Sequence, residues 1–219
     1  MLKGIYYWLL KNTGQRDERG GPSCGYLQAQ VRKCALRHLT AVYGYTLEVG
    51  CGEGLFLNNL IQKNPGVKVC GVDLSFSQLV SAMHRLDNGN NKVGLFQADA
   101  VCLPFKENSF KQVVCINVFM NIPDEEVVDR ILEEISRVVD KDGRVIIEIR
   151  NKDNPLIRIK YKLARYYDGT IGPGMLKAYS LREMREKILS KGLRVNKILR
   201  VGFPKMKSAP AIVIEAIKK

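Results

Sequence analysis

Apolar and polar positions follow one another along the chain in a pattern that predicts strands and helices in turn. Short apolar runs bounded by polar or glycine residues predict buried strands at 45–49, 67–72, 93–96, 111–118 and 145–149. Segments with apolar residues every three or four positions predict helices at 55–62, at 75–86 and from Asp124 to a stop at Gly143. This alternation predicts an α/β fold, with a parallel sheet covered by helices on both faces.

The pattern changes after Arg150. Residues 151–180 are basic and aromatic, with interspersed glycine and proline. A helix capped by Ser180 is expected at 181–190, and two strand-like runs follow at 193–201 and 211–216. Gly202, Pro204 and Pro210 mark the loop between those runs.

The region before the first strand has its own pattern. Residues 26–39 read as an amphipathic helix, and the run before it, 19–23, is rich in flexible residues. We therefore treat residues 1–44 as an N-terminal helical lid or interface segment. The remainder, 45–219, is expected to form one domain with a basic, acceptor-side insertion at 151–180.

One segment of the insertion, 156–167, has the pattern of a basic amphipathic helix. On a helical wheel Arg158, Lys162 and Arg165 share one face, and the opposite face carries Leu156, Ile159, Leu163 and Tyr167. Such a helix can lie on a membrane surface or on an anionic chain. It can equally be a lid that packs on a ligand cleft and leaves its basic face in solvent.

Length and composition narrow the class of protein. The 219 residues are 46% hydrophobic and 26% charged, which is typical of one globular domain. No apolar run approaches the roughly 18–20 residues of a membrane span, and the run at 5–10 is too short for a signal-peptide core. The six cysteines form no C-x-x-C pair, so we expect no metal site and a reduced, cytoplasmic setting.

The net charge of +13 is concentrated in the last third of the chain. From Arg150 onward there are 18 Lys and Arg against 5 Asp and Glu, which leaves 17 residues of each sign before it. This asymmetry favours an anionic partner for the C-terminal third. A surface that is charged only for solubility is the alternative.

The chemistry concentrates at the turn that follows the first strand, Glu48-Val-Gly50-Cys-Gly52-Glu-Gly54. Glycines there let the backbone approach a ligand closely, and the next helix offers free N–H groups. Asp73 follows 23 residues after Gly50, at the end of the second strand, where an acid can accept hydrogen bonds from ribose hydroxyls. The spacing predicts a nucleoside site.

The same turn discriminates between two ligand classes. A dinucleotide fingerprint counted from Gly50 needs a third glycine at position 55, which is Leu55 here. Glu48 beside the loop disfavours a pyrophosphate. It favours a ligand with an ammonium and a sulfonium group and no phosphate.

Five segments in order resemble the class I S-adenosylmethionine-dependent methyltransferases, especially the small-molecule branch with the ubiquinone/menaquinone-type enzymes. They are LEVGCGEG at 47–54, GVDLS at 71–75, QADAVCLPF at 97–105, VCINVFMNIPD at 114–124 and EEISRVVDKDGRVIIEI at 133–149. The resemblance implies a doubly wound, mostly parallel seven-stranded sheet whose last strand is antiparallel. It also implies S-adenosyl-L-methionine as cofactor and S-adenosyl-L-homocysteine as product.

The resemblance assigns roles to individual positions. It implies that the loop around the methionine part of the cofactor contains Glu48, Gly50, Gly52 and Gly54, with Cys51 as a small residue of the same loop. Asp73 matches the ribose-binding acid, and Leu74 the apolar residue beside the adenine. Asp99 matches the partner of the adenine amino group, Ala100 a backbone donor, and Asn117 the residue that faces the amino-acid end.

One departure affects the mechanism. Many relatives carry a histidine near the position of Asn121, whereas this chain has no histidine beyond His84. A histidine base from that segment is therefore excluded, and the catalytic residue stays unassigned. The segment after the fourth strand also lacks the N/D-P-P-Y/F motif of adenine-N6 enzymes. RNA 5-methylcytosine enzymes require a proline before their nucleophilic cysteine, and no proline precedes Cys115.

The acceptor has to be bound by the parts outside the matching motifs. We expect 26–39 and 151–180 to close over the cofactor, with an acceptor pocket formed by Tyr26, Asn121, Tyr166 and Tyr167. Arg158, Lys162 and Arg165 would steer an anionic acceptor. An anionic small molecule or lipid-linked acceptor is favoured, with peripheral contact at a membrane surface; tRNA or rRNA, or a non-catalytic cofactor-binding subunit, are the alternatives.

Overall fold

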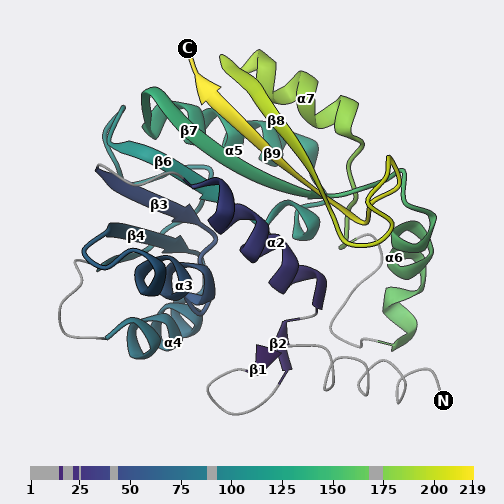
Figure 1. Ribbon diagram of the computed structural model, residues 1–219, viewed down its shortest axis with the longest axis horizontal. Coiled ribbons are helices and arrows are strands. Elements are labelled where there is room, and N and C mark those ends of the chain that lie inside the picture. The colour runs from purple at the N-terminus through teal and green to yellow at the C-terminus, as the bar shows by residue number, and fades with distance from the viewer. Residues whose placement is uncertain (1–14, 17–21, 25, 40–43, 88–92, 168–174) are drawn as a thin grey trace.

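The chain folds around one large sheet, as the computed structural model shows (Figure 1). The structure describes residues 15–16, 22–24, 26–39, 44–87, 93–167 and 175–219. Two short strands, β1 (Gln15–Arg16) and β2 (Pro22–Cys24), pair with each other apart from the main sheet.

The main sheet has seven strands in the order β5-β4-β3-β6-β7-β9-β8. Their bounds are β3 Tyr45–Val49, β4 Lys68–Asp73, β5 Val93–Gln97, β6 Phe110–Cys115, β7 Val139–Arg150, β8 Leu193–Val201 and β9 Ala211–Lys218. Neighbouring strands from β5 to β7 are parallel, and β9 runs antiparallel to both β7 and β8. The expected fold, with its last strand antiparallel, is confirmed.

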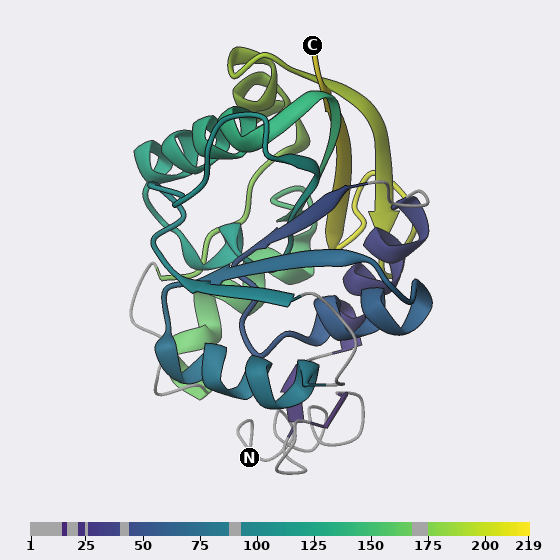
Figure 2. The same ribbon diagram turned by 90° about the vertical axis from the view of Figure 1, so that its left-hand side faces the viewer.

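Helices cover both faces of this sheet because successive strand residues point to opposite sides. On one face Val113 and Cys115 pack with α5 (Glu125–Val138) and α7 (Leu181–Ser190). On the other, Val114 and Ile116 pack with α2 (Tyr26–His38), α3 (Leu55–Lys63) and α4 (Phe76–Leu86). Figures 1 and 2 show the two layers on either side of the twisted strands.

Helix starts agree with the cap residues read from the sequence. Ser75 and Asp124 precede α4 and α5, and the Asp124 carboxylate accepts a hydrogen bond from the Glu126 N–H. Ser180 begins α7 through a capping box with Glu183, so that each side chain accepts from the other's backbone N–H.

The fourth and fifth predicted strands are present, but their bounds differ from the prediction: β6 ends at Cys115 rather than at Val118. Helix α5 ends at Val138 rather than near Gly143, and β7 already begins at Val139, which pairs with Phe110. A register shift then lets Gln112 pair with Arg144, and Asp142 has a φ of 58° within the extra residues. Because Val138 and Val139 are both fully buried, apolar spacing alone could not separate helix from strand here.

Helix α6 (Pro155–Tyr167) exposes the apolar face that the helical wheel identified. Leu156, Ile159 and Leu163 are all exposed, whereas Ile157 is buried and holds the helix to the domain. Pro155 occupies the first turn, where a missing N–H costs nothing, and the Asn154 side chain accepts a hydrogen bond from the Ile157 N–H. Within the described residues, the apolar face of this helix therefore does not pack as a lid.

Two further expectations concern membranes and metals. None of the helices in the described ranges has the length and apolar character to cross a bilayer. No group of metal-ligating side chains gathers among the described residues either, and Cys34, Cys51, Cys70, Cys102 and Cys115 are free thiols.

Candidate functional site

A cleft of about 740 Å³ opens at the carboxyl ends of the parallel strands. Its floor is formed by the residues that directly follow strands β3, β4, β5 and β6, including Gly50, Leu74, Ala98 and Ile116. In the sheet, β3 is flanked by β4 on one side and by β6 on the other, so the helices leave the sheet in opposite directions at this point. Open α/β sheets bind ligands at such a switch point.

The turn after β3 forms one wall of the cleft and depends on glycine. Gly50 has a φ of 73°, and a Cβ atom at this residue would lie 2.3 Å from Cγ2 of Val118. The N–H groups of Gly50 and Cys51 both donate to the Val72 carbonyl, at 2.8 and 2.9 Å. These bonds fix the turn to the end of β4, so the backbone can approach a ligand without side chains in between.

Asp73 at the end of β4 ties two parts of the cleft together. Its Oδ2 accepts a hydrogen bond from the Gly52 N–H at 2.7 Å, and its Oδ1 accepts one from the Ser75 N–H at 2.9 Å. A carboxylate has about four acceptor positions, so both oxygens keep a lone pair for a ligand. Asp73 lines the cleft, as the sequence predicted.

Glu48 is the most unusual charge of the site. Its side chain lines the cleft and is buried, and its Oε2 has no hydrogen-bond partner among the described residues. Burial raises the pKa of this carboxyl well above its ordinary value; the nearby Asp73 raises it further, and Arg32 opposes the change. A buried acceptor of this kind is satisfied by a cationic donor from a ligand.

Arg32 is a residue of the site that sequence reasoning missed. It comes from α2, is buried, and lines the cleft together with Gln28 of the same helix. The sequence carries a helical pattern at 26–39 but no signal that one of its arginines lines the same cleft as Glu48. Helix α2 therefore forms part of the cleft wall.

Asn117, just after β6, is held by a buried charge pair. Its N–H donates to Oε2 of Glu148 at 2.9 Å, and Nη2 of Arg150 donates to its Oδ1 at 2.9 Å. Arg150 also pairs closely with Oε1 of Glu148, and both side chains are almost fully buried. The available signal in the sequence was Glu148 inside the apolar run 145–149, followed at once by Arg150.

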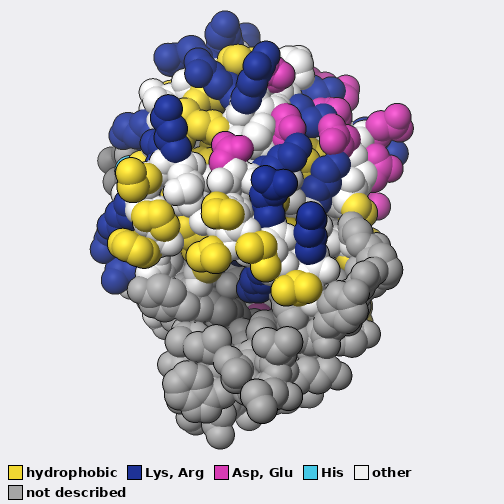
Figure 3. All heavy atoms as spheres, turned by 90° about the vertical axis from the view of Figure 1, so that its right-hand side faces the viewer, with side chains coloured by type: hydrophobic (Ala, Val, Ile, Leu, Met, Phe, Trp, Pro, Cys, Tyr) yellow, Lys and Arg dark blue, Asp and Glu magenta, His cyan; other side chains and the backbone are white. Residues whose placement is uncertain are grey.

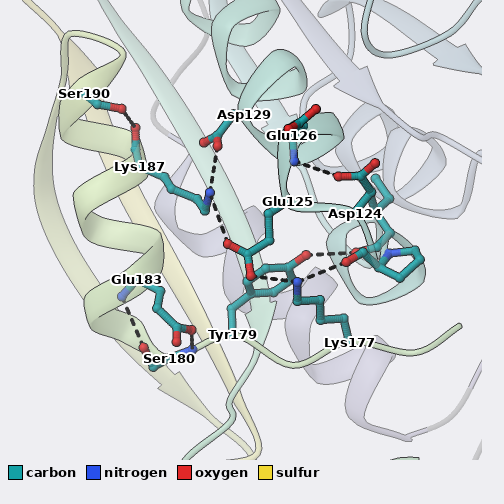
Figure 4. Close-up of polar contacts among 12 residues, drawn as sticks. Asp124, Glu125, Glu126, Asp129, Lys177, Tyr179, Ser180, Glu183, Lys187 and Ser190 are labelled. Atoms are coloured by element: carbon teal, nitrogen blue, oxygen red, sulfur yellow. Dashed lines mark hydrogen bonds and ion pairs between the residues drawn. The ribbon is translucent and has the colours of Figure 1, made fainter. Parts of the chain in front are cut away.

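The opposite wall is apolar and is supported by the segment before α7. Met120, Ile122, Val127 and Ile131 line it beside Asn121, whose Nδ2 donates to the Asn117 carbonyl at 3.3 Å. Behind this wall the Lys177 N–H donates to the Met120 carbonyl and the Tyr179 hydroxyl donates to the Ile122 carbonyl. Figure 4 shows Lys177 and Tyr179 directed toward the start of α5, where Lys177 also pairs with Glu125.

The cleft collects most of the residues singled out in the sequence. The structure places the following predicted residues around it: Glu48, Gly50, Cys51, Gly52, Asp73, Leu74, Asp99, Ala100, Asn117 and Asn121. Gly54 does not line the cleft. It precedes α3 with a φ of 75°, and a Cβ atom at this residue would lie 3.1 Å from Cβ of Ala82. The absence of a side chain at Gly54 therefore permits α3 to pack on α4. The side chains of Tyr26, Arg165, Tyr166 and Tyr167 lie outside the described part of the structure.

Comparison with known proteins agrees with this geometry. The family described as a methyltransferase domain matches residues 46–143. A phosphatidylethanolamine N-methyltransferase of Cereibacter sphaeroides is 32% identical over 154 residues, which cover 68% of this chain and 72% of that protein. A demethylmenaquinone methyltransferase of Lactobacillus johnsonii is 32% identical over 122 residues, covering 54% of this chain and 49%, about half, of the relative.

A solved structure shares the fold at lower identity. Magnesium protoporphyrin IX methyltransferase from Synechocystis PCC 6803, solved with bound SAH, superposes with a TM-score of 0.70 at 18% identity, covering 99% of this chain and 94% of its own. This chain has the glycine turn, the acid after β4 and the expected sheet order. It also matches the phosphatidylethanolamine N-methyltransferase over two thirds of both lengths. The chain therefore belongs to the class I S-adenosylmethionine-dependent methyltransferases.

Proposed function

We propose that this methyltransferase holds S-adenosylmethionine in the cleft at the ends of β3, β4 and β6, and methylates an anionic small-molecule or lipid-linked acceptor. The observation that carries the cofactor part is the unpartnered Oε2 of the buried Glu48, beside a turn that only glycine can form. When bound, the cofactor supplies a methyl group that is already activated on a sulfonium.

The residues of the cleft fit such a cofactor group by group. Glu48 is an acceptor for a positively charged ligand, and its desolvation is relieved by that charge. Asp73 keeps lone pairs for ribose hydroxyls while its other lone pairs hold Gly52 and Ser75. Asp99 and Leu74 lie at the more exposed end of the cleft, where the adenine would be bound.

The chain contributes mainly by positioning the reacting groups. Holding two reactants in line can supply about 7–11 kcal/mol of the barrier without acid–base chemistry. Asn117 and Asn121 lie together on the cleft wall, and buried contacts with Glu148 and Arg150 fix Asn117. A base is needed only for an acceptor that arrives protonated, and we assign none.

The acceptor class is supported by charge and by the apolar wall of the cleft. The excess positive charge of the chain lies after residue 149, which favours an anionic acceptor. Met120, Ile122, Val127 and Ile131 give the cleft an apolar side suited to a substrate with an apolar body. The names of two of the relatives refer to phosphatidylethanolamine and demethylmenaquinone, which supports the lipid-linked form of the proposal.

An RNA acceptor is the second candidate, and the basic C-terminal third is the observation that favours it. The motifs of two classes of nucleic-acid methyltransferase are missing from the sequence, which counts against this candidate. A tRNA (carboxymethyluridine(34)-5-O)-methyltransferase of Arabidopsis thaliana, 30% identical over 132 residues that cover 58% of this chain, adds to its support. A cofactor-binding subunit without its own activity is the third candidate.

Incubation with labelled S-adenosylmethionine and a fractionated cell extract tests these candidates. Label in the lipid or anionic metabolite fraction is the expected result, and it should disappear with the Asp73→Ala variant. Label in the RNA fraction alone would replace the acceptor proposal with the second candidate. Cofactor binding with no labelled product in any fraction would favour the third.

A further inference from the structure

We propose that the face formed by α6 and the β8–β9 loop docks on the surface of an anionic lipid bilayer. This inference goes beyond the proposed function and does not depend on it, since a methyltransferase of any acceptor class could carry such a surface. None of the apolar residues that form the face lines the cofactor cleft.

The apolar part of this face consists of five large side chains that are all exposed to solvent. Leu156, Ile159 and Leu163 project from α6, with Leu156 69% exposed. In the β8–β9 loop Phe203 is 91% exposed and Met206 is 68% exposed. Side chains of this size are rarely so exposed together on a surface that meets only water, and clusters of them mark interaction sites.

The helix and the loop form one surface because they are bonded to each other. Nδ2 of Asn154, at the start of α6, donates to the Ser208 carbonyl at 2.6 Å. Nδ2 of the buried Asn151 donates to the carbonyls of Lys207 and Ala209, both at 2.8 Å. Figure 3 shows apolar side chains gathered on this side of the molecule, where Figure 1 places α6 and the loop.

Positive charge surrounds the apolar residues. Neither 154–167 nor 200–210 contains an aspartate or a glutamate. The two segments carry these basic residues: Arg158, Lys160, Lys162, Arg165, Arg200, Lys205 and Lys207. Arg158, Lys162, Arg200, Lys205 and Lys207 are all exposed, and Figure 3 shows basic side chains on both flanks of the apolar residues.

Charge complementarity identifies the occupant as an anionic bilayer. Apolar side chains that enter the acyl boundary, bordered by lysine and arginine at headgroup level, are the arrangement of interfacial helices. With 13 residues α6 is about 20 Å long, shorter than the roughly 30 Å hydrocarbon core, so it lies on the surface. A protein partner would need no such excess of positive charge, which the exposed Asp153 before α6 offsets only in part. Base stacking would need more aromatic residues than Phe203.

Vesicle flotation of the full chain without cofactor tests the proposal. We expect flotation with vesicles of phosphatidylcholine and phosphatidylglycerol, and little with phosphatidylcholine alone. Raising the salt concentration from about 0.1 M to about 0.5 M should weaken binding, because it screens the surface charge. No flotation with the anionic vesicles at about 0.1 M salt would overturn the proposal.

Two variants separate the apolar from the basic contribution. Phe203→Ser with Met206→Ser should weaken vesicle binding at least tenfold. Arg158→Glu with Lys162→Glu and Lys205→Glu should weaken it about 100-fold or more, since each basic residue near the surface contributes roughly fivefold. The matched controls are Met83→Ser with Leu189→Ser, and Lys106→Glu with Lys141→Glu and Arg182→Glu. These residues are also exposed but lie on other elements.

The outcomes are distinguishable from a failure of folding or of the proposed function. Each variant should bind S-adenosylhomocysteine as the wild type does, which shows that the domain is intact. If the test and control variants lose vesicle binding equally, the loss comes from overall charge or apolar content, and the proposal of a docking face is overturned. The proposal would also be overturned if an oligoribonucleotide bound this face more tightly than the vesicles do. If the wild type forms a dimer and binds no vesicles, and Phe203→Ser abolishes the dimer, then the face binds a second copy of the chain.

Discussion

The backbone N–H of Asn117 donates to the carboxylate of Glu148 at 2.9 Å, across the boundary between β6 and β7. This bond takes the place of a ladder bond, so β6 ends at Cys115 and the chain turns into the cleft. Asn117 adopts a left-handed backbone with a φ of 60°. Arg150 holds both the Glu148 carboxylate and the Asn117 side chain, so one buried pair sets the shape of the cleft wall.

Substitution of Asn117 should separate its backbone role from its side-chain role. Asn117→Gly and Asn117→Ala both lose the contact from Arg150, but only alanine is strained at a φ of 60°. We expect Asn117→Ala to be less stable than Asn117→Gly by about 1 kcal/mol in urea unfolding. Equal stability of the two variants would contradict this account of the turn.

Gly50→Ala should damage both the fold and the cleft. The added Cβ would lie 2.3 Å from Val118, so the turn after β3 must shift. Gly66→Ala is the matched control, because Gly66 also has a positive φ, 85°, but open space around its Cβ position. We expect a loss of about 1 kcal/mol for the control and a larger loss for Gly50→Ala. Calorimetric titration with S-adenosylhomocysteine should show weaker binding for Gly50→Ala alone.

Glu48 should make cofactor affinity depend on pH. Burial raises the pKa of this carboxyl in the ligand-free protein, whereas a cationic ligand favours its ionised form. Binding then releases a proton from the protonated fraction, and affinity rises with pH above the ordinary glutamate range of about 4.3 until the raised pKa is passed. Calorimetry in buffers of different ionisation enthalpy measures the released proton. Glu48→Gln should bind more weakly and without this pH dependence.

Glu48 should also make the stability of the ligand-free protein depend on pH, but stability should fall as pH rises, whereas cofactor affinity rises. A carboxyl whose folded pKa is raised contributes stability at low pH, and the contribution is lost as pH rises from the unfolded pKa to the folded one. Ligand-free Glu48→Gln should therefore unfold at a higher urea concentration than the wild type at pH 8, and the difference should shrink toward pH 4. A wild type that is more stable than the variant at pH 8 would count against a strained Glu48.

Asp73→Ala should weaken cofactor binding about 10- to 150-fold. The variant loses a charged acceptor for the ligand, worth about 1.5–3 kcal/mol, and also the bonds that hold Gly52 and Ser75. Asp87→Ala is the control, since Asp87 is an exposed aspartate at the end of α4, outside the cleft. If calorimetry gives Asp73→Ala the affinity of the wild type, Asp73 does not contact the cofactor.

Ser180→Ala should cost about 1 kcal/mol of stability without affecting cofactor binding. The Ser180 hydroxyl accepts from the Glu183 N–H at 3.1 Å, and this half of the capping box is lost (Figure 4). Ser190→Ala at the other end of α7 removes only an exposed hydrogen bond to the Lys187 carbonyl and serves as the control. A Ser190→Ala variant less stable than Ser180→Ala would show that the cap contributes little.

The sequence by itself determined the elements and the class of the site. Strands 45–49 and 193–201 and the helix at 181–190 were predicted with the bounds that the structure has. Apolar spacing and cap residues act over a few positions, so they can be read without the fold. The glycine turn and Asp73 were also readable, because a strand end brings its next residues to one edge of the sheet.

Tertiary structure decided the features that join distant positions. Glu148 and Asn117 are 31 residues apart, and Arg32 of α2 lines the same cleft as Glu48; no local pattern encodes either arrangement. The shared boundary of α5 and β7 depends on Val139 pairing with Phe110. Val138 and Val139 would be buried whether the helix continued or the strand began there, so burial alone does not place the boundary. Periodicity shows that α6 has an apolar face. Only the packing of Ile157 against the domain decides that Leu156, Ile159 and Leu163 face solvent.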